Sequence, residues 1–270
     1  MNIEMIQQPL SSSVSQRKAR IAAAFGKAAQ SYDRHAAFQR EVGQQLLNEL
    51  PPDLHGCVVL DLGCGTGFFS EQMRQRGAEV ICADLSQSML EQARQRCGTS
   101  GFEYCHCDAE ALPLADHSVD FVFSSLALQW CESLSVSFRE IKRVLKPAGK
   151  GCFSILVAGS LIELEQAWAK VDSAQHVNRF ISGNAVKIAL AQAGCTPYQI
   201  DLCSFGLWYD SAMHLMKDLK GIGATHIDER TNRLISHRVL VQVEAAYQTF
   251  ANQEGLLPAT YQVCFGVIQQ

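Results

Sequence analysis

The length, composition and charge of the chain exclude several classes of protein. It has 270 residues, 47% hydrophobic and 19% charged, which is enough apolar material for an ordinary globular core. The net charge is −4, whereas nucleic-acid-binding proteins usually carry a basic excess. No apolar run approaches the ~20 residues of a membrane span. We therefore expect one domain with extensions, with neither nucleic acid nor a membrane as its partner.

The 11 cysteines favour a reducing compartment over a disulfide framework or a metal site. Their number is odd and no pair has C-x-x-C spacing. Cys105 and Cys107 flank His106, but alternate residues of a strand face opposite sides, so the three cannot converge on zinc unaided. The first 20 residues lack the apolar stretch of a secretory signal. We predict a cytoplasmic protein that holds no metal.

The first 50 residues differ in pattern from the rest of the chain. Residues 1–16 are polar and serine-rich, which predicts a loose tail. Residues 17–50 are alanine-rich and amphipathic, which predicts one or two helices with a break near Gly26 or Ser31. We predict that residues 1–50 form a tail and helical cover, and that residues 51–270 form the catalytic domain.

From Val58 onward, short apolar runs alternate with helical stretches. Strands are predicted at Val58–Leu62, Glu79–Asp84, Phe102–Cys107, Val119–Ser124 and Gly151–Val157. Helices are predicted at Gly67–Arg76, at Ser86–Arg96 with Ser86 as the N-cap, and at Leu134–Leu145, ended by Lys146–Gly149. This alternation predicts an α/β fold with a parallel sheet and right-handed crossovers.

After Val157 the alternation is less regular. Helices are predicted at Ser160–Val171, Asn184–Ala193, Ala212–Leu219 and Ser236–Asn252, and strands at Tyr198–Trp208 and Ala259–Ile268. The connections at about 158–181 and 209–235 are longer than a sheet needs. Because long connections in compact domains tend to carry function, we expect both to be substrate-side insertions.

The stretch VVLDLGCGTGFFS, residues 58–70, predicts a nucleotide site at a strand-to-helix turn. Gly63, Gly65 and Gly67 allow a sharp turn and let a ligand approach backbone N–H groups. The glycine spacing nearly fits a dinucleotide fingerprint, so alone it leaves a nicotinamide cofactor open. Asp61 disfavours a pyrophosphate and suits the cationic S-adenosylmethionine. Alternatively, or in addition, Asp61 caps the glycine turn.

Two further acids follow successive strands. Asp84 ends the second strand about 20 residues after Gly63, where a carboxylate commonly binds ribose hydroxyls; its structural alternative is a favourable charge at the next helix N-terminus. Asp108 follows the third strand and can accept from an adenine amino group. The carboxyl ends of parallel strands share one sheet edge, where ligands bind. The predicted cofactor-binding residues are Asp61, Gly63, Gly65, Gly67, Asp84, Leu85, Asp108, Ala109 and Ser125.

These motifs carry a family resemblance. VLDLGCGTG, ADLS, CDAEALPL and REIKRVLKPAGK resemble the class I S-adenosylmethionine-dependent methyltransferases, which implies a Rossmann-like seven-stranded sheet with an antiparallel last strand. IAAAFGKAAQSYDRHAAFQ, LALQWC, GSLIELEQAW, NRF and LKGIGATH resemble the malonyl-acyl carrier protein O-methyltransferases of biotin synthesis. That resemblance implies transfer of a methyl group to the free carboxylate of a malonyl thioester, leaving S-adenosylhomocysteine. It leaves acyl carrier protein and coenzyme A open as the acyl carrier.

A carboxylate needs no general base at neutral pH, since its pKa is about 4. The predicted substrate residues are Tyr32, Arg179, Lys220 and His226, each of which has an ordinary structural alternative. Trp130 is expected to wall the pocket or to pack in the core. Gly221 and Gly223 suggest a close backbone approach or a lid hinge.

A basic stripe lies on the predicted helix before the fifth strand. Arg139, Lys142, Arg143 and Lys146 are spaced to share one helical face, which suits an acidic carrier protein but is also typical of a solvated helix. The remaining alternatives are a methyltransferase acting on a small molecule such as a quinone precursor, a nicotinamide oxidoreductase, and a catalytically silent adenosyl-binding regulator. Asp61 and Phe68 oppose the oxidoreductase.

Overall fold

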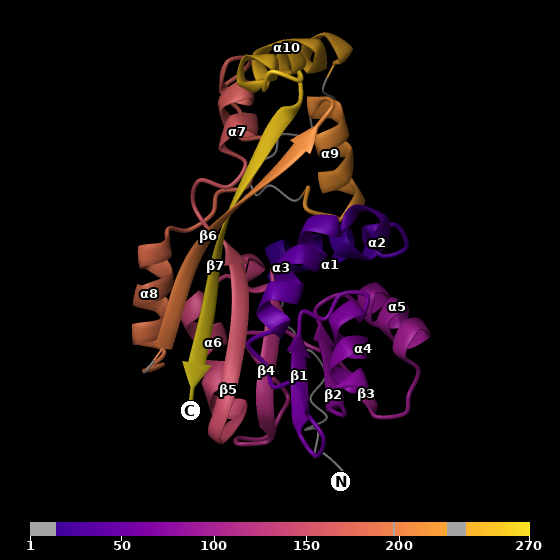
Figure 1. Cartoon of the computed structure of the whole chain (residues 1–270), viewed down its shortest axis with the longest axis vertical. Helices are drawn as coiled ribbons and strands as arrows, with labels where there is room; N and C mark the ends of the chain where they lie inside the picture. The colour runs from indigo at the N-terminus through magenta and orange to yellow at the C-terminus, as the bar shows by residue number, and fades with distance from the viewer. Residues whose placement is uncertain (1–14, 197, 226–235) are drawn as a thin grey trace.

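One seven-stranded sheet organises the fold (Figure 1). The computed structural model describes residues 15–196, 198–225 and 236–270. The strand order is β3-β2-β1-β4-β5-β7-β6, with β1 to β5 parallel and β7 antiparallel to both β5 and β6. The strands are β1 (Val58–Leu62), β2 (Glu79–Asp84), β3 (Phe102–His106), β4 (Val119–Ser125), β5 (Leu145–Leu156), β6 (Tyr198–Tyr209) and β7 (Leu257–Gln269). The predicted sheet with its antiparallel last strand is confirmed.

Helices cover both faces of the sheet. They are α1 (Gln16–Ala28), α2 (Tyr32–His35), α3 (Ala37–Leu47), α4 (Phe68–Gln75), α5 (Gln87–Cys97), α6 (Leu134–Val144), α7 (Ile162–Ala169), α8 (Gly183–Gln192), α9 (Ala212–Gly221) and α10 (His237–Tyr247), with short 3₁₀ turns η1 (Leu128–Trp130) and η2 (Gln248–Phe250). Serine hydroxyls cap α1, α8, α9 and α10 by accepting a first-turn N–H. Within the described ranges, no helix has the length and apolar character to cross a bilayer.

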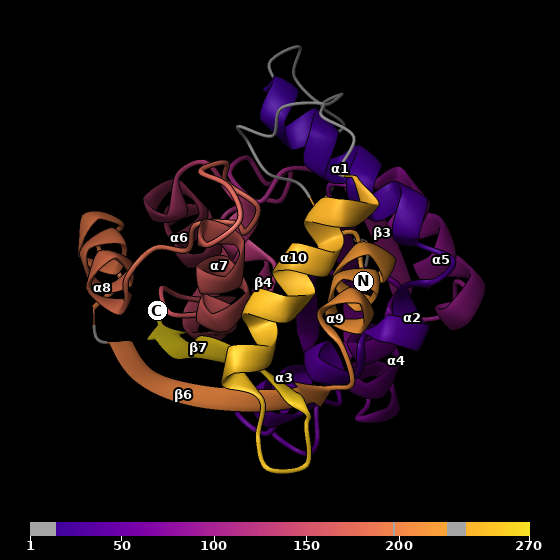
Figure 2. The same cartoon turned by 90° about the horizontal axis from the view of Figure 1, so that it is seen from above.

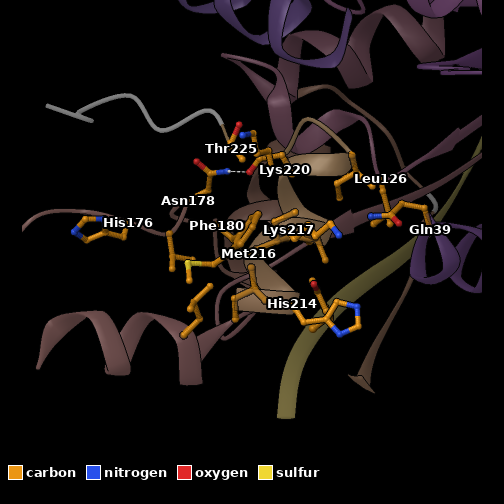
Figure 3. Close-up of a pocket in the computed structure, with 18 of the residues that line it drawn as sticks. Gln39, Leu126, His176, Asn178, Phe180, His214, Met216, Lys217, Lys220 and Thr225 are labelled. Atoms are coloured by element: carbon orange, nitrogen blue, oxygen red, sulfur yellow. Dashed lines mark hydrogen bonds between the residues drawn. The ribbon is translucent and has the colours of Figure 1, made fainter. Parts of the chain in front are cut away.

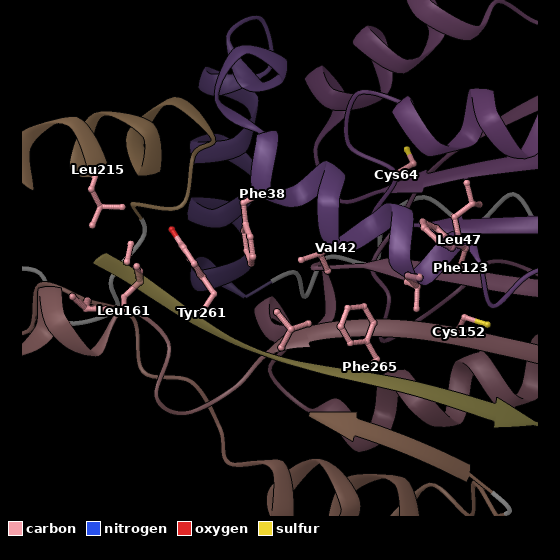
Figure 4. Packing of buried hydrophobic residues seen from close by; sticks show 14 of the residues in the cluster. Phe38, Val42, Leu47, Cys64, Phe123, Cys152, Leu161, Leu215, Tyr261 and Phe265 are labelled. Atoms are coloured by element: carbon pink, nitrogen blue, oxygen red, sulfur yellow. The ribbon is translucent and has the colours of Figure 1, made fainter. Parts of the chain in front are cut away.

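Two clusters of buried side chains form the core, one on each face of the sheet. Helices α3, α4 and α5 pack on one face, where Phe38 of α3 stacks on Tyr261 of β7 with ring centroids 4.1 Å apart (Figure 4). Helices α6 and α8 cover the other face, where Phe138 packs against Phe153. Burial on both faces explains why all five residues of β1 are buried.

The structure differs from the predicted elements at two places. The N-terminal segment forms three helices rather than one or two. Of the two positions predicted for the break, Ser31 is confirmed as the N-cap residue of α2, whereas Gly26 lies inside α1. The strand expected to start at Gly151 begins at Leu145, directly after α6, because Leu145 pairs with Val119 of β4 before the register shifts. The proline and glycine of residues 146–149 therefore lie within β5, in an irregular stretch between the paired residues Leu145 and Lys150.

Strands β6 and β7 extend beyond the rest of the sheet as a two-stranded ribbon. Pairing of β5 with β7 stops at Leu156 and Val263, whereas β6 and β7 stay paired as far as Tyr209 and Leu257. Helices α7, α9 and α10 gather around this ribbon as an upper lobe (Figures 1 and 2). The predicted insertions 158–181 and 209–235 contain α7 and α9. The lobe stands above the carboxyl ends of the parallel strands, where α1 and α2 also lie.

Candidate active site

The glycine turn leaves an open stretch of backbone at the carboxyl end of β1. Gly63 and Gly65 both have positive φ, at +77° and +55°. A Cβ on Gly63 would lie 2.3 Å from the Cβ of Ala127, whereas nothing lies within 4 Å of one on Gly65. Gly67 is the N-cap of α4. The turn thus needs glycine for close packing at Gly63 and presents bare backbone at Gly65.

Asp61 is buried beneath this turn. It is 2% exposed, and its Oδ2 accepts a hydrogen bond from Ser70 Oγ of α4 at 2.5 Å. Burial raises the pKa of the Asp61 carboxyl to about 7, and the neighbouring Asp84 carboxylate adds to this rise. Because an ionised carboxylate here lacks the solvent that would stabilise it, a cation bound nearby would be strongly favoured.

Asp84 connects the glycine turn to α5. Its Oδ2 accepts from the Gly65 N–H at 3.0 Å, and its Oδ1 accepts from the Ser86 N–H at 2.8 Å. Ser86 is the N-cap residue of α5, as predicted, but its side chain makes no capping hydrogen bond. Burial raises the pKa of Asp84. The Asp84 carboxylate therefore lies at the N-terminus of α5, as in its structural alternative, and it also lines a pocket.

Asp108 is paired with a lysine that sequence analysis missed. Its Oδ1 accepts from the Glu110 N–H, and its Oδ2 accepts from Lys18 Nζ of α1 at 2.5 Å; Lys18 also pairs with Glu110. The Lys18 and Asp108 side chains are only 9% and 16% exposed. Burial opposes the lysine charge, but the hydrogen bonds and charges of the two carboxylates outweigh it and raise the pKa of Lys18. This ion cluster holds α1 over the sheet edge.

Two narrow pockets meet at the glycine turn. One, of about 110 Å³, is covered by side chains of α1; the other, of about 50 Å³, lies beside Asp61. They share Tyr32, Gly63, Gly65 and Ser125. Eight of the nine predicted cofactor residues line them, and the exception is Gly67. The pocket of about 110 Å³ is called the nucleoside pocket below, and the pocket of about 50 Å³ the Asp61 pocket.

The chemistry of these pockets fits a nucleoside with a cationic tail. The nucleoside pocket places the carboxylates of Asp84 and Asp108 beside the apolar Leu85, and carboxylate oxygens are able to accept hydrogen bonds from ribose hydroxyls and from an amino group. The Asp61 pocket has a carboxylate, which suits an ammonium, and open space beside Gly65 that leaves room for the group attached to it. S-adenosylmethionine has these groups in this order.

A much larger chamber adjoins both pockets. It has a volume of about 940 Å³ and lies between the sheet edge and the upper lobe (Figure 3). Its walls are mainly apolar, with contributions from α1, α7, α9, α10 and the ribbon. It shares Phe25, Tyr32, Leu126 and Trp130 with the nucleoside pocket, and Tyr32 and Gln39 with the Asp61 pocket. A ligand in the chamber would therefore lie next to a ligand in either pocket.

The predicted substrate residues fall in different places. Tyr32 lines all three cavities, and burial raises the pKa of its phenol, so it is a hydrogen-bond donor at neutral pH. Lys220 lines the chamber. Arg179 is exposed and does not line the chamber, although its neighbours Asn178 and Phe180 do. His226 lies outside the described residues.

The glycines of LKGIGATH allow a close approach between α9 and the N-terminal helices. A Cβ on Gly221 would lie 2.3 Å from the His35 ring of α2, and one on Gly223 would lie 2.9 Å from the Phe25 Cα of α1. His35 Nδ1 also lies 2.7 Å from Asp218 Oδ1 of α9. Of the two interpretations offered for these glycines, the structure shows the close backbone approach.

Two polar residues of the chamber were not predicted from the sequence, because they do not belong to any recognisable motif. Lys217 lies one turn before Lys220 on α9, and Gln39 lies inside an amphipathic helix. Trp130, by contrast, forms the expected pocket wall and packs edge-to-face on Phe25, with ring centroids 5.3 Å apart.

The basic stripe is largely occupied by contacts within the chain. Arg143 binds Glu140 and Asp116, and Lys146 Nζ lies 2.7 Å from Asp120 Oδ2. Lys142 donates to the Gly194 carbonyl. These contacts favour the structural interpretation of the stripe.

Comparison with known proteins identifies the family. A family model described as a methyltransferase domain matches residues 60–153. The malonyl-acyl carrier protein O-methyltransferase of Serratia marcescens is 42% identical over 254 residues, covering 93% of this chain and 95% of that protein. The chain belongs to the malonyl-acyl carrier protein O-methyltransferase family. S-adenosylmethionine is thus confirmed as the cofactor, and the nicotinamide oxidoreductase alternative is wrong.

Two further comparisons extend this assignment. The "Biotin biosynthesis bifunctional protein BioHC" of Cellvibrio japonicus is 42% identical over 252 residues. The match covers 93% of the present chain and 50% of that bifunctional protein. A solved Haemonchus contortus N-methyltransferase in complex with S-adenosylhomocysteine has a TM-score of 0.61 at 17% identity, covering 95% of this chain and 60% of that one. That likeness supports the class I methyltransferase fold.

Proposed function

We propose that the protein transfers a methyl group from S-adenosylmethionine to the free carboxylate of a malonyl group held as a thioester on acyl carrier protein. The product is the methyl ester that enters pimeloyl and biotin precursor synthesis. The main structural support is the large chamber that joins both cofactor pockets at Tyr32. The names of the relatives supply the substrate class.

The reaction places few chemical demands on the protein. Bound S-adenosylmethionine supplies an electrophilic methyl group, and the malonyl carboxylate is already ionised because its pKa is about 4. The protein has to orient one carboxylate oxygen and exclude water. The apolar chamber wall reduces solvation of the carboxylate, and the Tyr32 hydroxyl, protonated at neutral pH, donates to the oxygen that does not react.

The rim of the chamber on α9 suits an anionic arm. Lys217 and Lys220 are exposed, line the chamber, and form no ion pair among the described residues. They can attract the phosphodiester of the carrier's pantetheine arm. Lys146 of the basic stripe is bound to Asp120. Asp120 comes six residues before Leu126, which lines the chamber, and this separation corresponds to roughly 20 Å along an extended strand. We therefore place the carrier protein over α9 and not over α6.

The test is methyl transfer from labelled S-adenosylmethionine, with malonyl-acyl carrier protein, malonyl-coenzyme A and the two acetyl analogues offered separately. We expect labelling of malonyl-acyl carrier protein, weaker labelling of the coenzyme A thioester, and none of the acetyl compounds. Equal labelling of malonyl and acetyl thioesters, or none, would contradict the proposed substrate. Labelling of a quinone precursor in place of the thioesters would support the small-molecule alternative.

A further inference from the structure

Two residues that line the chamber have an unpartnered side-chain amide oxygen. Among the described residues, the buried side-chain polar atoms without a hydrogen-bond partner are the Oε1 atoms of Gln39, Gln129 and Gln270. Gln39 and Gln129 line the chamber, whereas Gln270 follows β7 at the opposite edge. A buried acceptor without a donor is costly, so such an atom in a site points to a donor that a ligand supplies.

Gln39 lies where substrate and cofactor meet. Only Tyr32 and Gln39 are shared, among the residues described, between the chamber and the Asp61 pocket. Gln129 reaches the chamber alone, and its Nε2 already donates to the Leu126 carbonyl at 2.6 Å. Figure 3 shows the Gln39 nitrogen turned toward Leu126 and its oxygen turned away from the chamber. The two ends of this amide therefore face different surroundings.

The backbone that carries Gln39 is held firmly. Its neighbour Phe38 is 4% exposed and stacks on Tyr261. Arg40 Nη1 donates to the Asp33 carbonyl at 2.6 Å, which ties α3 to α2. A side chain with such flanking contacts can position a ligand group, because its backbone does not have to be ordered on binding.

We propose that Gln39 bridges the cofactor and the substrate. Its Oε1 accepts a hydrogen bond from the α-ammonium of the methionine moiety, and its Nε2 donates to the carboxylate oxygen that does not attack. Both bonds are charge-assisted, and together they align the carboxylate with the sulfonium methyl. No proton moves and no covalent bond forms at Gln39. The substrate half of this inference rests on the proposed function.

The cofactor half is tested by calorimetric binding of S-adenosylhomocysteine and of its analogue without the α-amino group. Gln39→Met should weaken binding of S-adenosylhomocysteine about tenfold to a hundredfold and leave the affinity for the analogue unchanged. Gln39→Glu should keep the affinity for S-adenosylhomocysteine, since its carboxylate still accepts from the ammonium. Equal losses for both ligands in Gln39→Met, or no loss for either, would overturn the ammonium contact.

The substrate half is tested by steady-state kinetics of malonyl-acyl carrier protein methylation. Gln39→Glu should lower kcat/KM by about tenfold or more, because it replaces a donor with a charge that repels the carboxylate. Gln44→Glu, an exposed position on the same helix, makes the same charge change and should behave as wild type. Wild-type kinetics in Gln39→Glu would refute the bridge while leaving the proposed function intact. An inactive wild-type protein would refute the proposed function, and the binding arm would still decide the ammonium contact.

Discussion

Asp61 should make cofactor affinity depend on pH near neutrality. Burial raises the pKa of this carboxyl from 3.8 to about 7 in the protein without ligand. A cationic cofactor beside it favours the ionised form, so a protonated Asp61 must first lose its proton when the cofactor binds. The ionised fraction falls from about 0.9 at pH 8 to about 0.1 at pH 6. The affinity for S-adenosylmethionine should therefore fall about tenfold, or about 1.4 kcal/mol, over this range.

Isothermal titration calorimetry measures this linkage directly. Binding of S-adenosylmethionine, without acyl substrate, is followed at pH 6, 7 and 8 in buffers with different ionisation enthalpies. About half a proton should leave Asp61 on binding at pH 7. Asp61→Asn keeps an oxygen that can accept from Ser70 Oγ, so it should fold normally, bind more weakly at pH 8 and lose the pH dependence. A flat wild-type profile, or the same slope in Asp61→Asn, would refute this reasoning.

Three other outcomes follow from the structure. Tyr32→Phe should lower kcat by about tenfold with little change in cofactor affinity, as single-turnover and binding measurements would show, since it removes one donor at the reacting carboxylate. Lys217→Glu combined with Lys220→Glu should raise KM for malonyl-acyl carrier protein about tenfold at low salt. Arg139→Glu, at an exposed position on α6, should leave KM unchanged. An equal rise of KM in both variants would contradict docking over α9. The pKa of Asp61 is higher in the folded protein than in the unfolded chain, so the folded protein binds more protons between about pH 4 and 7. The contribution of Asp61 to stability therefore falls as pH rises through that window. Urea titrations should show that the free energy of unfolding of Asp61→Asn increases relative to wild type from pH 5 to 8.

The cofactor edge could be predicted from sequence because its determinants are local. Asp61, Asp84 and Asp108 each follow or end a short apolar run, and the ends of parallel strands meet at one edge. The start of β5 could not be predicted in this way. Pro147 and Gly149 resemble a helix stop followed by a loop, but Leu145 and Lys150 on either side of them both pair with β4, so residues 146–149 form an irregular stretch within β5.

The chamber depends on contacts between distant segments, and sequence patterns do not report them. Arg179 has the charge expected of a carboxylate partner, yet the backbone turns it outward while Asn178 and Phe180 face the chamber. Lys217 and Gln39 lie on ordinary amphipathic helices, where a polar residue normally indicates a solvent-facing position. Only the packing of α9 and α3 shows that these two side chains reach the same cavity.

The β6–β7 ribbon has a consequence for the order in which the protein acquires its structure during synthesis. Strand β7 lies between β5 and β6, although it is the last of the seven to be made, so β6 has no sheet partner until residues 257–269 are available. Strands β1 to β5 and the cofactor edge can pair earlier, because their partners are close in sequence. A nascent chain should therefore recognise S-adenosylmethionine before it has walls to enclose an acyl group.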